Sequence, residues 1–295
     1  MPNSEEIAYW NDEAGSRWAT FQERIDHVLA PLGAAGLASA ALQPAEAVLD
    51  IGCGCGATLL ELANAVGAKG SVVGVDVSQS MLAVAEQRAQ GLGLANVRCV
   101  LADASTYAFG EAAFDLAFSR FGVMFFDDPV GAFANVRRSL RADGRLVFVC
   151  WRDLAANPWF HVPLEAVRPH VAAQPKPDPE APGPLAFADP NRVRVILEHA
   201  GFEDVQFEAF DARLTLGLGP RACELLSQIG PASRLLAGAD DRARADAVVA
   251  LDRALSAHET DGGVVLGGGV WIVSARPLPR PSRSAGESPP PQVRV

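Results

Sequence analysis

The stretch "VLDIGCGCGA", Val48 to Ala57, decides how the rest of the chain is interpreted. It begins as a short apolar strand and then places Gly52, Gly54 and Gly56 on alternate positions before a helix-forming segment. Glycines in such a turn permit positive φ angles and let a ligand approach the backbone closely. The first turn of the following helix directs its N–H groups towards that ligand. The stretch therefore predicts a ligand-binding turn at the carboxyl end of a strand.

Apolar runs that resemble strands alternate with helical segments on either side of this turn. The expected strands are "AVLDIG", "SVVGVDVS", "VRCVLADA", "FDLAFSRFG" and "GRLVFVCW", over residues 47–151. The segments between them include "ATLLELANAVG", "SQSMLAVAEQRAQGLG" and "DPVGAFANVRRSLRADG", which have the composition and spacing of helices. Strands separated by helices in this way predict an α/β fold built from parallel βαβ units.

The flanking regions extend this α/β unit. Residues 4–42 have a helical pattern that Pro31 and Gly33 are expected to interrupt. The Pro-rich region 157–190 predicts an extended connection or a mobile loop, and a helix is expected to start at Pro190 with Asp189 as its cap. A long strand "EDVQFEAFDARLTL", two helices within residues 219–260 and a last strand "GGVWIVSARP" follow. The tail, residues 277–295, has too few apolar side chains for a core and is expected to be disordered.

Composition limits the classes of partner. The 295 residues carry a formal charge of −10, which argues against nucleic acid or an anionic membrane surface. No run of about 18 apolar residues is available to span a bilayer, so we expect no stable membrane anchor. The five cysteines are odd in number, and no charged-then-apolar leader begins the chain. These features predict a cytoplasmic protein with reduced thiols.

The glycine turn alone leaves its ligand open. Gly52-x-Gly54-x-x-Ala57 also satisfies the dinucleotide fingerprint, so the turn suits NAD or FAD as well. Asp76 ends the second strand about 20 residues further on, where a carboxylate accepts the hydroxyls of a ribose. Asp103 ends the third strand, where it can accept a hydrogen bond from an adenine amino group or cap a helix.

Taken together, these segments resemble a known family. The series "VLDIGCGCG", "VVGVDVS", "VRCVLADAS", "FDLAFSRFGVMFFDDP" and "LRADGRLVFVCW" is similar to class I S-adenosylmethionine-dependent methyltransferases. Within that class it resembles the small-molecule branch that includes ubiquinone/menaquinone-type methyltransferases. The resemblance implies a Rossmann-like, mostly parallel sheet of seven strands in the order 3-2-1-4-5-7-6, with strand 7 antiparallel. A helical insertion is expected between strands 6 and 7.

The resemblance also implies roles for individual residues, with S-adenosyl-L-methionine as cosubstrate and S-adenosyl-L-homocysteine as product. Asp50 and the three glycines would contact the methionine part, Asp76 would hold the ribose, and Ser119 would lie near the methyl group. Residues around the adenine would be Val77, Met81, Asp103 and Ala104.

The resemblance divides the chain into functional regions. Residues 1–45 would form an N-terminal helical lid in which Trp18 covers the cosubstrate. Residues 46–276 would form the methyltransferase domain, with a cover over the acceptor at about 157–190 and 219–260. Such a cover suits a small, partly apolar or aromatic acceptor, methylated on oxygen, carbon or nitrogen by in-line displacement.

Catalytic groups on the acceptor side are harder to assign. His161 and Tyr9 are candidates for a general base, as are His170 and Tyr107. Arg120, after the fourth strand, can orient an anionic or aromatic acceptor or pair with a nearby carboxylate.

The paired cysteines are a departure from the family. Cys53 and Cys55 lack further ligands at metal-site spacing, so no metal is predicted.

The sequence also allows other functions. They are a quinone-precursor methyltransferase, an NAD-dependent oxidoreductase that uses the same glycine turn, and a non-catalytic protein that keeps the cosubstrate pocket. A homodimer is also allowed.

Overall fold

A computed structural model describes residues 4–173 and 178–279 of the chain. Strands and helices alternate through its first half, as the apolar runs predict. The strands are β1 Ala47–Ile51, β2 Ser71–Asp76, β3 Val97–Leu101, β4 Phe114–Arg120, β5 Leu140–Trp151, β6 Phe202–Thr215, β7 Glu259–Thr260 and β8 Gly263–Pro277. The helices are α1 Ser4–Asn11, α2 Glu13–Thr20, α3 Gln22–Ala40, α4 Ala57–Val66, α5 Gln79–Gly91, α6 Pro129–Ser139, α7 Pro158–Val167, α8 Pro190–His199, α9 Gly219–Gln228, α10 Gly230–Ala237 and α11 Asp241–Ser256. Two short 3-10 helices span Val123–Phe125 and Arg168–His170.

The central sheet has the predicted order. Its strands run β3-β2-β1-β4-β5-β8-β6, and β8 is antiparallel to both of its neighbours. The expected order 3-2-1-4-5-7-6 is therefore confirmed, because β8 takes the place of the seventh strand. The structure adds the two-residue β7, which pairs with the start of β8. The carboxyl ends of β1, β2 and β4 meet at one edge of the sheet, where the glycine turn lies.

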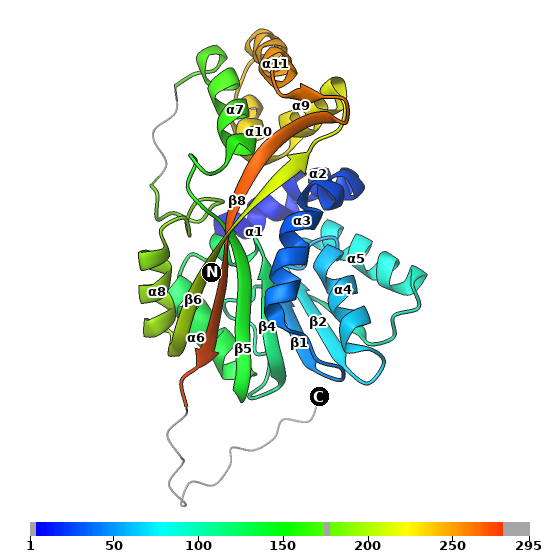
Figure 1. The fold of residues 1–295 in the computed structure, drawn as a ribbon, viewed down its shortest axis with the longest axis vertical. Coiled ribbons are helices and arrows are strands. Elements are labelled where there is room, and N and C mark those ends of the chain that lie inside the picture. The colour runs from blue at the N-terminus through cyan, green and yellow to red at the C-terminus, as the bar shows by residue number, and fades with distance from the viewer. Residues whose placement is uncertain (1–3, 174–177, 280–295) are drawn as a thin grey trace, which may run out of the picture.

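Helices cover both faces of the sheet (Figure 1). α3, α4 and α5 pack together on one face, and α6 packs with α8 on the other. The central strands β1 and β4 are largely buried, and large fully buried aromatic side chains fill the core, including Phe118, Phe133 and Phe148. This two-sided burial fixes the strand ends that carry the polar residues of the candidate site.

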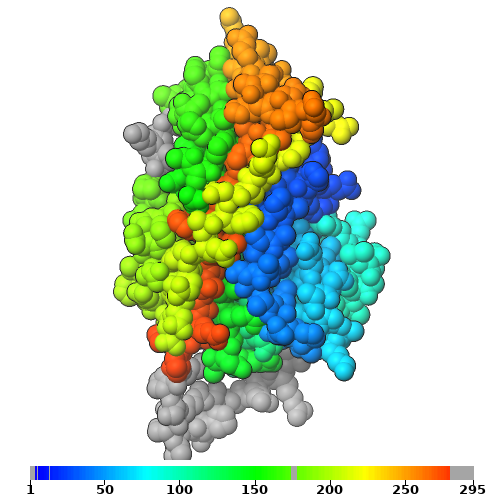
Figure 2. All heavy atoms as spheres, viewed as in Figure 1, coloured from blue at the N-terminus to red at the C-terminus, as the bar shows by residue number. Residues whose placement is uncertain are grey.

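A second group of helices lies beyond the carboxyl ends of the strands. β6 and β8 run on past the sheet and carry α7, α9, α10 and α11, which appear at the top of Figure 1. In the space-filling view this group stands above the blue N-terminal helices (Figure 2). We call these four helices, together with the outer parts of β6 and β8, the upper lobe.

The expected break at Pro31 and Gly33 is wrong. α3 continues through both residues, and the N-terminal helices end instead near Asp12 and Phe21. Pro31 is exposed, whereas its neighbours Leu29 and Leu32 are buried, so packing on both sides holds the helix across the missing N–H.

Two other expectations need correction. The start of region 157–190 is not extended, because Pro158 opens α7, and the insertion before β8 contains three helices rather than two. Asn157 explains α7: its buried amide accepts the Gly269 N–H and donates to the Gly269 carbonyl, which pins the helix start to β8. The helix expected over residues 128–144 ends at Ser139, where β5 begins.

Two findings concern the ends of the chain and the membrane. Most of the tail expected to be disordered, residues 280–295, lies outside the described residues. Among residues 4–173 and 178–279, no helix is long and apolar enough to cross a membrane.

Candidate functional site

The glycine turn connects β1 to α4 and approaches the segment after β4. Gly52 and Gly54 have φ angles of +67° and +53°. A Cβ on Gly52 would lie 2.6 Å from the Cα of Gly122, so only glycine fits between the two backbones. A Cβ on Gly54 would meet only the Cε of Met81, at 3.9 Å, beside the cavity described below. Gly52 therefore serves packing, and Gly54 keeps the wall of a cavity open.

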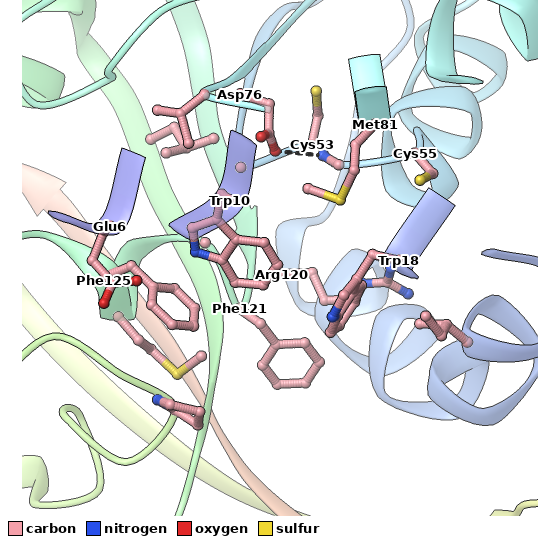
Figure 3. Close-up of a pocket in the computed structure, with 18 of the residues that line it drawn as sticks. Glu6, Trp10, Trp18, Cys53, Cys55, Asp76, Met81, Arg120, Phe121 and Phe125 are labelled. Atoms are coloured by element: carbon pink, nitrogen blue, oxygen red, sulfur yellow. Dashed lines mark hydrogen bonds between the residues drawn. The ribbon is translucent and has the colours of Figure 1, made fainter. Parts of the chain in front are cut away.

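Asp76 ties this turn to the end of β2. One carboxylate oxygen accepts the Gly54 N–H at 2.8 Å, and the other accepts the Ser78 N–H at 2.9 Å (Figure 3). Burial raises the pKa of Asp76, and the two backbone hydrogen bonds oppose that rise. A carboxylate offers about four acceptor positions, so Asp76 can still accept from a ligand hydroxyl.

Asp50 lies beneath the turn rather than on the cavity wall. Its side chain is fully buried, one oxygen accepts the Thr58 hydroxyl at 2.9 Å, and the other has no partner among the described residues. Burial raises the pKa of Asp50 to about 7. Thr58, not Asp50, reaches the cavity.

A cavity of about 180 Å³ opens above the turn, between the strand ends, the N-terminal helices and the upper lobe. Eight of the predicted cosubstrate residues line it: Trp18, Gly52, Gly54, Asp76, Val77, Met81, Asp103 and Ala104. Asp50, Gly56 and Ser119 do not. The buried Ser119 hydroxyl instead donates to the Ile51 carbonyl and accepts the Gly122 N–H, which joins β4 to β1.

Aromatic side chains form the other half of the cavity. The rings of Phe121 and Trp151 are stacked with centroids 4.2 Å apart, and Trp159 and Phe160 pack against Trp151. Phe121 has a φ of +67°, an uncommon conformation for a residue with a Cβ. This aromatic half suits a flat, largely apolar molecule.

The N-terminal helices close one side of the cavity. Figure 3 shows the Trp10 ring across its middle, with Asp76 and Met81 above it and Phe121 below. Trp10 meets Trp18 and Phe125 edge-to-face, at centroid distances of 5.8 Å and 5.3 Å. Trp18 therefore belongs to an aromatic cluster at the cavity rather than to the core alone.

The three predicted catalytic residues have different surroundings. His161 is exposed and does not line the cavity, so the structure does not place it where a base is needed. Tyr9 lines the cavity, and its hydroxyl accepts a hydrogen bond from Nε of Arg234 at 3.2 Å. Arg120 also lines the cavity, 3.9 Å from Asp26.

Several other residues that line the cavity carry no local sequence signal. Asp26 and Gln22 come from α3, Glu6 from α1 and Arg234 from α10. Each stands in an ordinary helical pattern, and only the packing of distant segments brings it to the cavity. The pattern of polar residues at the strand ends does not predict them.

The two cysteines of the turn point in different directions (Figure 3). Burial raises the pKa of both thiols, that of Cys55 to about 12. Metal binding and redox chemistry need the thiolate, so these surroundings favour neither.

Comparisons with known proteins agree with this geometry. Residues 48–144 match the family model described as a methyltransferase domain. Over 103 residues the chain is 41% identical to an aklanonic acid methyltransferase of Streptomyces sp. (strain C5), covering 35% of this chain and 47% of that protein. Over 174 residues it is 33% identical to a nocamycin O-methyltransferase of Saccharothrix syringae, covering 56% and 61%. The match thus spans about half to three fifths of the length of these relatives.

A quinone-related protein and a solved structure extend the comparison. The demethylmenaquinone methyltransferase of Bacillus cytotoxicus is 31% identical over 106 residues, which cover 36% of this chain and 45% of that protein. The crystal structure of the YcgJ protein from Bacillus subtilis superposes with a TM-score of 0.55 at 19% identity, covering 85% of this chain and 98% of that one. The second likeness shows the fold alone.

The resemblance to class I small-molecule methyltransferases is therefore confirmed. The chain has the Rossmann-like fold of that class, and residues 48–144 match the model of a methyltransferase domain.

Proposed function

We propose that the chain transfers a methyl group from S-adenosylmethionine to a small, partly apolar or aromatic acceptor. One observation carries this proposal: a single cavity joins the glycine turn and Asp76 to a wall of stacked aromatic rings. The first half has the polar groups that a nucleoside needs, and the second half has the surface that a flat acceptor needs. The two relatives named for aklanonic acid and nocamycin support an acceptor of this kind.

The residues at the turn fit the cosubstrate. Asp76 keeps acceptor capacity for ribose hydroxyls, Gly54 leaves the wall open, and Asp103, which also lines the cavity, would accept a hydrogen bond from the adenine amino group. The faces of Trp10 and Trp18 suit a cation, because an aromatic ring attracts positive charge. Bound S-adenosylmethionine supplies a methyl group on a positively charged sulfur.

The chain's own residues would then align the acceptor and exclude water. Phe121, Trp151 and Phe160 hold a flat molecule by stacking and edge contacts. Of the four residues predicted as a general base, only Tyr9 lines the cavity. We therefore assign Tyr9 the role of accepting the proton that leaves a hydroxyl or amine of the acceptor. We also propose that α1 and α2 act as a lid, because Tyr9, Trp10 and Trp18 come from them.

The other readings have less support. An NAD-dependent oxidoreductase would use the same turn, but the family model that matches is a methyltransferase domain. A quinone precursor remains an acceptor to include in a screen, because one relative is named for demethylmenaquinone.

Ligand binding tests the proposal. We expect S-adenosylhomocysteine at 100 times its Kd to stabilise the fold by about 2.7 kcal/mol, seen as a rise in Tm, and NADH to leave Tm unchanged. Asp76→Asn should weaken S-adenosylhomocysteine binding at least about tenfold, because a buried hydrogen bond to the ligand is altered. Stabilisation by NADH alone would contradict the proposal.

Asp189→Asn is the matched control. Like Asp76, Asp189 accepts the backbone N–H of the residue two positions on, at 2.9 Å, but it caps α8 and does not line the cavity. It should keep the affinity of the unaltered protein. Equal losses in both variants would show that the effect is structural.

A further inference from the structure

Arg120 is the last residue of β4 and lines the cavity. Its side chain is 13% exposed, and burial lowers its pKa. Among residues 4–173 and 178–279 the guanidinium has no hydrogen bond, and its one ionic contact is Asp26 at 3.9 Å. A guanidinium has five N–H donors, so a buried one without a hydrogen bond lacks its usual partners.

Asp26 is already engaged by other groups. Its Oδ2 lies 2.9 Å from the Arg88 guanidinium and accepts a hydrogen bond from the Gln22 amide at 2.5 Å. Arg88 also donates to the Cys55 carbonyl in the glycine turn, at 2.6 Å. One carboxylate therefore faces two guanidinium groups.

The remaining acidic groups near Arg120 do not supply the missing charge. Asp50 and Glu61 act on Arg120 through space, without a hydrogen bond. Burial raises the pKa of Asp50 to about 7, so it carries only part of a charge at neutral pH, and Glu61 is exposed. The cluster of Asp26, Arg88 and Arg120 thus has an excess of positive charge, and of its two arginines only Arg120 reaches the cavity.

A planar guanidinium is complementary to a carboxylate in shape and in charge, and it binds a carboxylate through two parallel hydrogen bonds. Two sources of a carboxylate are open: the amino-acid end of the methyl donor, and the acceptor. Arg120 shares Asp26 with Arg88, which holds the glycine turn, and Figure 3 draws it beside Trp18. Arg234 lines the cavity from α10 in the upper lobe, where it bonds to Tyr9, and we expect it on the acceptor side. This placement favours the donor.

We propose that Arg120 binds the α-carboxylate of S-adenosylmethionine, and that Asp26 positions it for this contact. The inference rests on the proposed function, because it needs that cosubstrate. It gives Arg120 a role in holding the donor in place of the acceptor role expected from the sequence.

The test compares two ligands that differ only in the carboxylate. Calorimetry would give the Kd of S-adenosylhomocysteine and of its decarboxylated analogue, which keeps the amine, the thioether and the adenosine. The unaltered protein should prefer S-adenosylhomocysteine by about tenfold to hundredfold, the range of hydrogen bonds to charged groups. Arg120→Gln should raise the Kd of S-adenosylhomocysteine by that factor and change the Kd of the analogue by less than about threefold. The variant should therefore bind the two ligands with similar affinity.

Arg24→Gln is the control, because Arg24 on α3 is also paired with a carboxylate, Glu224, but does not line the cavity. It should keep the preference. Equal weakening of both ligands by Arg120→Gln, or no weakening of either, would overturn the inference. A rise only in the acceptor KM, with the donor affinity kept, would show that the acceptor supplies the carboxylate. Failure of the unaltered protein to bind S-adenosylhomocysteine would instead refute the proposed function.

Discussion

At the scale of single residues, Asp50 shows how burial changes the meaning of a motif. The sequence places it beside the glycine turn, but in the structure it is fully buried and does not line the cavity, which its partner Thr58 reaches instead. Its pKa of about 7 exceeds the value of 3.8 for a solvated aspartate. Between these two values the folded protein binds more protons than the unfolded chain.

The free energy of unfolding should therefore fall as the pH rises from about 4 to about 7, and this contribution should become constant above pH 7. Asp50→Asn removes the titration and keeps an acceptor for Thr58. Between pH 5 and pH 8 the free energy of unfolding of the unaltered protein should fall by on the order of 2 kcal/mol more than that of the variant. Urea unfolding at several pH values measures this, and parallel profiles would contradict it.

Gly54 permits a second residue-scale prediction. Gly54→Ala should destabilise the fold by about 1–2 kcal/mol, because alanine resists a positive φ, and should also weaken S-adenosylhomocysteine binding. Gly93→Ala is the control: its φ is +66°, nothing lies within 4 Å of the added Cβ, and it follows α5 outside the cavity. The two variants should lose similar stability in chemical unfolding, but only Gly54→Ala should lose affinity. Equal affinities would place Gly54 outside the binding site.

At the scale of elements, two of the contacts that hold α1 are polar side-chain contacts with distant segments. Asn11 donates to the Val77 carbonyl at 2.7 Å, and Tyr9 meets Arg234 of α10. The Arg234 guanidinium lies 4.2 Å from the centre of the Tyr9 ring and also donates to its hydroxyl. This pair joins the N-terminal helices to the upper lobe across the cavity.

Arg234→Ala should therefore speed hydrogen exchange of the α1 amides, since a cation–π contact and a hydrogen bond are lost together. Tyr9→Phe should have a smaller effect, because the ring stays beneath the guanidinium. Mass spectrometry of exchanged peptides measures both. Arg244→Ala, at an exposed arginine of α11, is the control. Unchanged exchange in α1 after Arg234→Ala would show that the pair does not hold the helix.

The elements also show what local sequence can predict. The strands and the glycine turn were predictable, because apolar runs and glycine spacing are local signals. Local sequence does not predict that α3 continues across Pro31, because tertiary packing holds it there. It also does not predict α7, because Asn157 is anchored by Gly269, 112 residues away. Asp26 and Arg234 reach the site only through the fold, so no local pattern could identify them.

At the scale of the whole molecule, one sheet supports two regions with different tasks. Its parallel part presents the polar strand ends, and the outer parts of β6 and β8 carry the upper lobe over them (Figure 1). The cavity lies where these regions and the N-terminal helices meet. The aromatic residues proposed to face the acceptor thus come from other segments than the glycine turn proposed to hold the cosubstrate.

The length of β8 has a consequence for how ligands enter. Residues 270–275 pair with β5, and the pairing with β6 continues outward to Val265, so one continuous ribbon joins the sheet to the upper lobe. A doubly hydrogen-bonded ribbon resists bending away as a hinge. We therefore expect ligands to enter past the proposed lid of α1 and α2, which would move by changes in backbone angles at Asp12 and Phe21, the residues between the helices.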